Sequence, residues 1–389
     1  MASLSINLSD TFKEFFESEK SGATMLLFCT LISILMTNTL FGQNYLNFWQ
    51  REFFGLSIEH WINDGLMAIF FLLIGLELER ELYVGELSNF KNALLPIFAA
   101  IGGMIVPALI YFTLNHGTPT QDGIGIPMAT DIAFALGVLA ILGNRIPASL
   151  KVFVVAYAVI DDLGAIIIIA LFYTAKLSIL YLAGALVVWV ILVMFNRLFK
   201  MQSLIPYMIG GILMWFLMLK SGIHATVAGV LLAFAIPFLS KDKNQDSPSH
   251  RLEHLLHKPA AFIILPLFAL ANTGIIFSGN WINSLLSFNG LGIAVGLILG
   301  KPIGVLLMCL LAVSLGLCRL PSDLKWSHIA GAGMLGGIGF TMSIFITNLA
   351  FVGNPEVINA SKIAILIVSL TAGIIGLLWL RSVGRVVNN

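Results

Sequence analysis

The segment Val152–Phe172 is apolar and long enough to cross a bilayer, yet two neighbouring carboxylates, Asp161 and Asp162, stand near its middle. A carboxylate in hydrocarbon costs about 2.5–3.5 kcal/mol even on lenient insertion scales, and two adjacent carboxylates also repel each other. A chain that keeps both is expected to use them on a polar particle inside the membrane. The first hypothesis is therefore an ion or proton path.

The composition indicates a membrane protein along its whole length. Of the 389 residues, 58% are hydrophobic and only 11% are charged, whereas soluble domains carry about 25% charged residues. The first twenty residues are polar and precede any apolar stretch, so we expect no cleavable signal peptide. The formal net charge of +1 gives no basis for nucleic-acid binding. The lipid bilayer is the expected surrounding.

Apolar windows of about 20 residues predict an all-α polytopic fold with about twelve transmembrane helices. The predicted spans are approximately 22–40, 60–78, 93–113, 124–143, 150–174, 178–196, 204–219, 223–240, 259–277, 288–312, 328–350 and 360–380.

The placement of basic residues predicts that both termini are cytoplasmic. With this orientation only Arg51, Lys176, Lys220 and Lys362 fall outside and Lys301 lies within a span, so the other sixteen of the 21 lysines and arginines lie inside. We therefore expect a cytoplasmic segment at 1–21, a single transporter domain at 22–381 and a cytoplasmic tail at 382–389.

Two predicted spans are poor continuous helices. The fourth contains Pro127 just before Thr130 and Asp131, and the eleventh contains a glycine-rich run with Gly336, Gly337 and Gly339. Unwound backbone at membrane depth is tolerated only where it is buried in protein or lines a cavity, and close helix packing through small residues is the alternative. Each interrupted span is the middle member of a triplet, which predicts inverted three-helix repeats at about 93–174 and 288–380, with broken helices crossing at mid-membrane.

Four ionisable residues fall at similar depth in these repeats: Asp131, Asp161, Asp162 and Lys301. Neighbouring helical residues point about 100° apart, so one of the paired aspartates can face a cavity while the other meets Lys301. A purely structural network of buried ion pairs is the alternative, although such a network does not require a second adjacent carboxylate.

Nine motifs lie between about Ser21 and Arg381: Trp61–Asp64, Phe71–Glu77, Ala99–Pro107, Ala129–Gly137, Ile160–Ala165, Lys220–Thr226, Arg251–His254, Gly300–Pro302 and Gly337–Ser343. With these motifs the chain closely resembles the bacterial Na⁺/H⁺ antiporter A (NhaA) family, which is a recognised example of inverted-repeat transporters.

This resemblance implies a secondary antiporter of the bacterial inner membrane and not an enzyme. The implied activity is export of Na⁺ or Li⁺ in exchange for protons, and no cofactor is expected besides these transported small cations. The resemblance implies Na⁺ and proton binding at Asp162, an Asp161–Lys301 salt bridge that opens during transport, and Asp131 with Thr130 at the crossing of the broken helices. It also implies pH sensing by residues matching Glu77, Arg80, Glu81, Glu253, His254 and His257, with a contribution from His224. We further expect electrogenic exchange and activation at alkaline pH.

Two departures from the family pattern are visible. Glu79 stands where family members usually carry a basic residue, so it joins the pH-sensing candidates. The loop Leu40–Ser57 is shorter than the periplasmic β-hairpin loop of the family. The sequence therefore does not decide whether the chain forms a homodimer held together by that hairpin. Without the resemblance, the charged run Glu77–Glu81 is more simply explained as a solvated helix end, the residues around Glu253 as a surface patch of ion pairs, and His224 as an ordinary interfacial histidine. A cation-coupled symporter of an organic anion on the same architecture is the alternative function. An intramembrane aspartyl protease fits less well, because its aspartates lie on separate helices.

Overall fold

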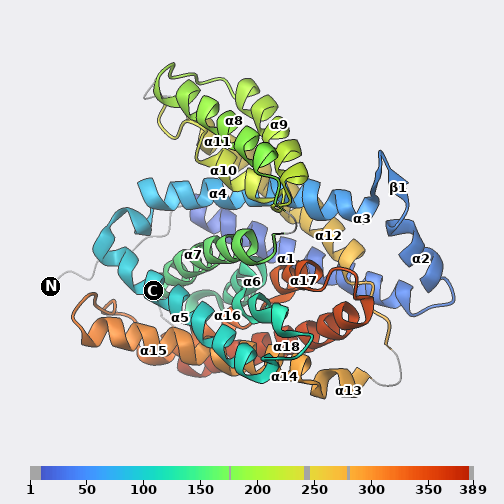
Figure 1. Ribbon diagram of the computed structural model, residues 1–389. Helices are drawn as coiled ribbons and strands as arrows, with labels where there is room; N and C mark the ends of the chain where they lie inside the picture. The colour runs from blue at the N-terminus through green and yellow to red at the C-terminus, as the bar shows by residue number, and fades with distance from the viewer. Residues whose placement is uncertain (1–9, 175–176, 241–245, 278–280, 385–389) are drawn as a thin grey trace. The chain divides into compact units, whose positions relative to one another are not determined.

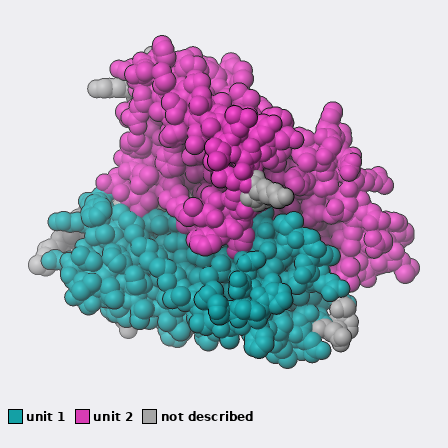
Figure 2. Space-filling view, in the orientation of Figure 1, with its two compact units in different colours: residues 1–28, 89–162, 277–389 teal, residues 29–88, 163–276 magenta. Residues whose placement is uncertain are grey.

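The computed structural model describes residues 10–174, 177–240, 246–277 and 281–384, and nearly all of its regular structure is helical. The polytopic helical architecture is therefore confirmed. The chain forms two compact units: unit 1 comprises 1–28, 89–162 and 277–389, and unit 2 comprises 29–88 and 163–276 (Figure 2). The predicted cytoplasmic segments at 1–21 and 382–389 lie partly outside the described residues.

Across the described part of the chain, nine helices or helical runs are long and apolar enough to cross a membrane, and a tenth is formed if the bent pair of α16 and α17 counts as one span. The expected number of twelve is thus not confirmed. The seventh predicted span is α9, Ile205–Ser221, which has 17 residues, and the eighth contains only the seven-residue α10, Val227–Ala233.

Proline explains why α10 is short. Pro237 has no backbone N–H to donate to the carbonyl of Ala233, four residues earlier, and its ring would clash with that carbonyl in a continuous helix. The helix accordingly ends at Ala233, and the amide of Ala235 bonds to Leu232 in a tighter turn. The apolar window at 223–240 records hydrophobicity and cannot reveal this break.

Unit 1 holds both interrupted helices. Its helices are the first part of α1 (Asp10–Thr37), α5 (Phe90–Asn115), α6 (Ile132–Leu142), the first part of α7 (Ala148–Phe172), α13 (Trp281–Leu286), α14 (Phe288–Val295), α15 (Lys301–Ser314), α16 (Trp326–Gly336), α17 (Phe340–Ala350) and α18 (Pro355–Val383), with 3₁₀ segments at Gln121–Met128 and Gly143–Arg145. Side chains that accept a backbone N–H start several of them: Asn89 caps α5, Ser287 caps α14 and Asn354 caps α18.

Within unit 1, α15 packs against α5 and α16 (Figure 1). The contact with α5 depends on two facing glycines, because a Cβ atom on Gly102 would overlap the carbonyl oxygen of Gly304 and the reverse is also true. Small residues allow two helix backbones to approach closely, which is how membrane helices pack where burial from water gives no driving force. This approach brings Lys301, at the start of α15, into the interior of unit 1.

Unit 2 contains the remaining elements. These are the second part of α1 (Asp10–Thr37), α2 (Gly42–Trp49), β1 (Glu52–Phe53), β2 (Leu56–Ser57), α3 (Ile58–His60), α4 (Met67–Tyr83), a 3₁₀ turn at Glu86–Ser88, the end of α7, α8 (Ile179–Arg197), α9, α10, α11 (Pro248–Pro259) and α12 (Leu265–Asn272). The antiparallel strands β1 and β2 turn at Phe54 and Gly55, both with positive φ. The short loop Leu40–Ser57 therefore contains a helix and a minimal hairpin.

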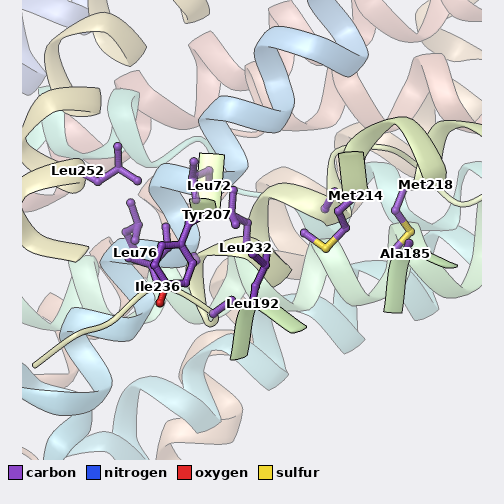
Figure 3. Close-up of a cluster of buried hydrophobic side chains, with 13 residues drawn as sticks. Leu72, Leu76, Ala185, Leu192, Tyr207, Met214, Met218, Leu232, Ile236 and Leu252 are labelled. Atoms are coloured by element: carbon purple, nitrogen blue, oxygen red, sulfur yellow. The ribbon is translucent and has the colours of Figure 1, made fainter. Parts of the chain in front are cut away.

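The core of unit 2 is formed by α4, α8, α9, α10 and α11. Buried side chains from these helices meet in one cluster, in which Leu72 and Leu76 of α4, Tyr207 of α9 and Leu232 of α10 lie near one another (Figure 3). Trp189 donates its indole N–H to the carbonyl of Leu231, 2.7 Å away. This packing fixes the end of α4 that carries the charged residues Glu77–Glu81.

Among the described residues, three helical runs contain a π-helical segment, in which the helix is wound more widely by about one residue per turn. Trp61–Leu66 leads into α4, Ala260–Ile264 joins α11 to α12, and Gly296–Gly300 joins α14 to α15. Such segments occur often at functional sites. The third one ends immediately before Lys301.

We expect Gly304→Ala to destabilise the protein, because the added methyl group would meet backbone of α5 that cannot move aside like a flexible side chain. Overpacking of this kind costs about 1–3 kcal/mol. The thermal unfolding midpoint in detergent measures the effect. The matched control is Gly373→Ala in α18, where the new Cβ would lie 3.5 Å from Ile338, an ordinary contact. A midpoint for Gly304→Ala equal to that of the control would contradict the close approach.

Candidate functional site

The two interrupted helices meet at their breaks, inside unit 1. The 3₁₀ segment Gln121–Met128 gives way to extended backbone before α6 begins at Ile132, and α16 ends at Gly336 before α17 begins at Phe340, with a bend of 46° between them. The amide of Asp131 donates to the carbonyl of Ile338 over 2.6 Å. Each break therefore supplies a partner for backbone groups of the other.

Asp131 lies at the N-terminal ends of two half-helices. Its Oδ1 accepts the amide of Phe134 in α6, and its Oδ2 accepts both the amide and the hydroxyl of Thr341 in α17, at 3.0 and 2.5 Å. Helix N-termini carry a partial positive charge and unsatisfied N–H groups, which a buried carboxylate complements. Asp131 thus caps α6 and also binds the start of α17.

Thr130 links Lys301 to the end of α16. Its hydroxyl accepts a hydrogen bond from the Lys301 ammonium at 2.7 Å and donates to the carbonyl of Gly336 at 2.9 Å. Gly336 is the last residue of α16, where the carbonyls carry a partial negative charge. The ammonium therefore lies near a negative helix end, while Asp131 lies at positive ones.

Lys301 also forms an ion pair with Asp161, with 2.7 Å between Nζ and Oδ2. Both side chains are 0% exposed, and Asp162 is 1% exposed. A buried pair is stable only if the attraction and the hydrogen bonds offset the large cost of removing two charges from water, so breaking it leaves a buried charge uncompensated. The structure brings together Thr130, Asp131, Asp161, Lys301 and the glycine-rich break in unit 1, with Asp162 adjacent in sequence.

The pH-sensing candidates, apart from His224, gather in unit 2, on the end of α4 and on α11. Arg80 lies 3.4 Å from Glu81 and 3.1 Å from Glu253, and Glu79 accepts a hydrogen bond of 2.9 Å from Ser249 at the start of α11. Glu77, Glu79 and Glu81 are all buried, which a solvated surface patch would not require. His254 and His257 lie on the same helix α11.

His224 lies apart from this group, beside Asp64. Its Nδ1 is 4.0 Å from one oxygen of Asp64, while His60 lies 2.8 Å from the other oxygen. The backbone of Asp64 accepts the indole N–H of Trp215. His224 and the α4–α11 cluster are therefore separate groups within unit 2.

Sequence reasoning missed several participants. His250 lies 3.8 Å from Glu253, three residues later on α11, and His60 pairs with Asp64, four residues later. Both pairs have helical spacing, so a search for i,i+3 and i,i+4 partners of acidic residues would have found them. Ser249 gave no such signal, because its partner Glu79 is 170 residues away.

No group of three or more His, Cys, Asp or Glu side chains suited to a resident metal ion occurs within the ranges that the structure covers. The oxygen atoms near the two breaks are of the kind that suits hard cations: carboxylates, the Thr130 hydroxyl and backbone carbonyls.

Comparison with known proteins identifies relatives along the whole chain. A family model described as Na⁺/H⁺ antiporter 1 matches residues 13–380. A protein from Dechloromonas aromatica (strain RCB), named Na(+)/H(+) antiporter NhaA, is 65% identical over 380 residues, which cover 98% of each chain. A protein from Flavobacterium johnsoniae, named Na(+)/H(+) antiporter NhaA 1, is 60% identical over 376 residues, with 97% of this chain and 98% of the relative covered. A protein from Helicobacter pylori (strain ATCC 700392 / 26695), also named Na(+)/H(+) antiporter NhaA, is 46% identical over an alignment of 425 positions that covers 97% of each chain.

We expect Lys301→Ala to lower the free energy of unfolding by about 3–5 kcal/mol, because it leaves Asp161 buried without its cation. Adding Asp161→Asn should recover part of the loss. Thermal unfolding of the purified single and double variants tests this coupling, with the exposed Lys325→Ala in the same unit as a control for loss of a lysine. A double variant no more stable than Lys301→Ala would show that the two residues do not stabilise each other.

Proposed function

The chain belongs to the Na⁺/H⁺ antiporter 1 family, and from that membership we propose that it exchanges Na⁺ or Li⁺ for protons across the membrane, with Asp162 as the shared binding group. It is a multi-pass bacterial membrane protein. We place it in the inner membrane with both termini cytoplasmic, as the distribution of lysine and arginine favours. The observation that carries the proposal is a buried Asp161–Lys301 pair directly beside a second buried carboxylate, at the meeting point of two broken helices.

The exchange follows from competition for one carboxylate. Asp162 binds either a proton or a Na⁺ ion that has lost its water, and a site that holds one of them at a time couples the two flows when it is opened alternately to each side. Asp161, Thr130 and the carbonyls of the broken helices provide further oxygen atoms for a desolvated cation. No additional coupling device is required.

Lys301 balances charge through the cycle. While Asp161 is paired with Lys301, the pair is neutral, and the partial charges of the half-helix ends are complemented by Asp131 and by Lys301 through Thr130. Binding of Na⁺ adds a positive charge that competes with the ammonium for the aspartate oxygens. The Asp161–Lys301 bond is then expected to open, which makes Asp161 available to the ion.

The membrane potential can drive this exchange if more protons enter than Na⁺ ions leave. Each unit of net charge that crosses contributes about 2.3 kcal/mol per 100 mV. We propose such electrogenic exchange, which uses an inside-negative potential to export Na⁺.

Two effects are proposed to make activity rise at alkaline pH. Protons compete with Na⁺ at Asp162, so raising the pH frees the carboxylate. In addition, the cluster on α4 and α11 contains three acidic residues of α4 together with Arg80, Glu253, His254 and His257, and imidazoles change charge between about pH 5 and 8. A charge change there can bias the position of α11 against α4. His224 beside Asp64 is a separate candidate for the same role.

We expect Asp162→Asn to abolish Na⁺-dependent proton movement while the protein still folds, because a neutral amide cannot carry the exchangeable charge. Asp161→Asn should be milder, since it removes the partner of Lys301 and not the shared site. The measurement is the recovery of fluorescence from a pH-sensitive dye in proteoliposomes on addition of Na⁺, Li⁺ or K⁺. Near-normal exchange by Asp162→Asn would rule out the shared carboxylate.

Competition and sensing are separated by measuring the pH profile at saturating Na⁺. If the α4–α11 cluster is a sensor, we expect acid-side inhibition to persist at saturating Na⁺ and to shift in Glu253→Gln and in Glu79→Gln, because each removes a charge from the cluster. Ser249→Ala removes only the hydroxyl that donates to Glu79. This substitution should shift the pH profile of the protein that retains Glu79, but it should cause no further shift in the Glu79→Gln variant. If saturating Na⁺ erases the inhibition in every variant, competition at Asp162 is sufficient and the sensor is rejected.

A further inference from the structure

Tyr157 lies on α7 one helical turn before Asp161 and is completely buried. Its hydroxyl is 3.4 Å from the hydroxyl of Thr130, and the Lys301 ammonium lies 5.8 Å from the centre of its ring. The Tyr157 side chain thus contacts both Thr130 and Lys301, which bind each other next to the paired aspartates. None of the roles assigned above uses it.

The hydrogen-bonding capacity of Thr130 decides how the two hydroxyls interact. A threonine hydroxyl has one hydrogen to donate and two lone pairs that accept. The hydrogen goes to the carbonyl of Gly336, and one lone pair accepts from Lys301. Tyr157 must therefore be the donor, to the second lone pair, across a contact that is long for an O–H···O bond.

Two glycines shape the space that the tyrosine occupies. A Cβ atom on Gly103 of α5 would lie 3.0 Å from the Tyr157 hydroxyl, and one on Gly336 would overlap that hydroxyl. The ring of Phe153, one turn earlier on α7, stacks on the ring of Tyr157 with an interplanar angle of 12°. The tyrosine is therefore held on several sides, with its hydroxyl directed at Thr130 and the end of α16.

We propose that Tyr157 is a positioning residue that holds Lys301 and Thr130 in the closed Asp161–Lys301 arrangement, and so sets how strongly Na⁺ must bind to open it. This inference rests on the proposed antiport at Asp162. The hydroxyl fixes Thr130, and the electron-rich ring face attracts the ammonium, an interaction that is stronger where water is excluded. A ligand binds more weakly in apparent terms when a smaller fraction of the protein is in the binding-competent state. Stabilising the closed pair lowers the fraction that is open to Na⁺, and so it raises the apparent KM for Na⁺.

Tyr157→Phe tests the hydroxyl without removing the ring. Losing one weak hydrogen bond that favours the closed pair should lower the apparent KM for Na⁺ by about two- to fivefold at fixed pH. Tyr157→Leu also removes the ring and should lower it further. An unchanged or increased KM in Tyr157→Phe overturns the proposal.

The matched control is Tyr111→Phe. Tyr111 is another fully buried tyrosine of unit 1, but its hydroxyl bonds to the carbonyl of Thr120 and to Asn289, which are not among the proposed ion-binding residues. Both substitutions remove a buried hydroxyl and can lower the thermal midpoint, but only Tyr157→Phe should change the KM. An equal change of KM in both variants would show a general packing effect and overturn the proposal.

Coupling to Thr130 provides a second test. In Thr130→Ser, which keeps the hydroxyl, Tyr157→Phe should still change the KM, whereas in Thr130→Val it should have no further effect through that contact. An effect of equal size in Thr130→Val would place the action of the hydroxyl elsewhere and overturn the assignment.

A stability measurement separates failure of this inference from failure of the proposed function. Exchange by the wild type and by Tyr111→Phe reports on the function itself. Independently of transport, the thermal destabilisation caused by Tyr157→Leu should shrink when Lys301→Ala is already present, because the ring then has no ammonium to hold. Additive destabilisation in the double variant overturns the role of Tyr157 even if exchange is absent.

Discussion

A helix that is interrupted inside a bilayer leaves backbone donors and acceptors that no surrounding water can satisfy, and unit 1 is organised around that constraint. Its two breaks are placed against each other, so that the amide of Asp131 bonds to the carbonyl of Ile338. The Asp131 carboxylate then serves the N-terminal ends of α6 and α17, and Thr130 serves the C-terminal end of α16. The charged residues follow from this arrangement, because opposite helix ends need opposite charges. Asp131 and Thr130, which bond to the interrupted backbone, thus also supply oxygen atoms at the proposed ion site. Thr130 in addition binds the ammonium of Lys301, which pairs with Asp161.

The sequence predicted this site well because a charged residue within a membrane span is costly and therefore has few explanations other than function. Asp131, Asp161, Asp162 and Lys301 are conspicuous in apolar runs, and the glycines before Phe340 and the proline before Thr130 mark the two breaks. The predicted lysine–aspartate contact is present, whereas the ion-binding role of Asp162 remains a prediction. Hydropathy did less well on boundaries. It does not detect that Pro237 ends α10, and it cannot place Ser249 against Glu79 or Tyr157 beneath Lys301, because those contacts depend on the approach of separate helices.

Glu79 illustrates how a local departure acquires meaning only in three dimensions. In the sequence it adds one more acid to a charged run, and the simplest expectation is an exposed side chain at a helix end. In the structure it is buried and accepts a hydrogen bond from the first turn of α11, next to a neighbour, Arg80, that binds Glu253 on the same helix. Two adjacent residues of α4 therefore contact α11 with opposite charges. The cluster thus joins two helices through residues that include the buried Glu79.

The π-helical segment Gly296–Gly300 fixes the direction in which Lys301 points. One extra residue in a helical turn rotates everything that follows by about 100° relative to a regular α-helix of the same sequence. Removing a single residue from this segment would keep the lysine in the chain but turn the helix beyond it to a different face. Charge, hydropathy and residue identity would be almost unchanged by such a deletion. The geometry of the site thus depends on the helical phase of the chain, a property that the length of one short segment controls and that no individual side chain carries.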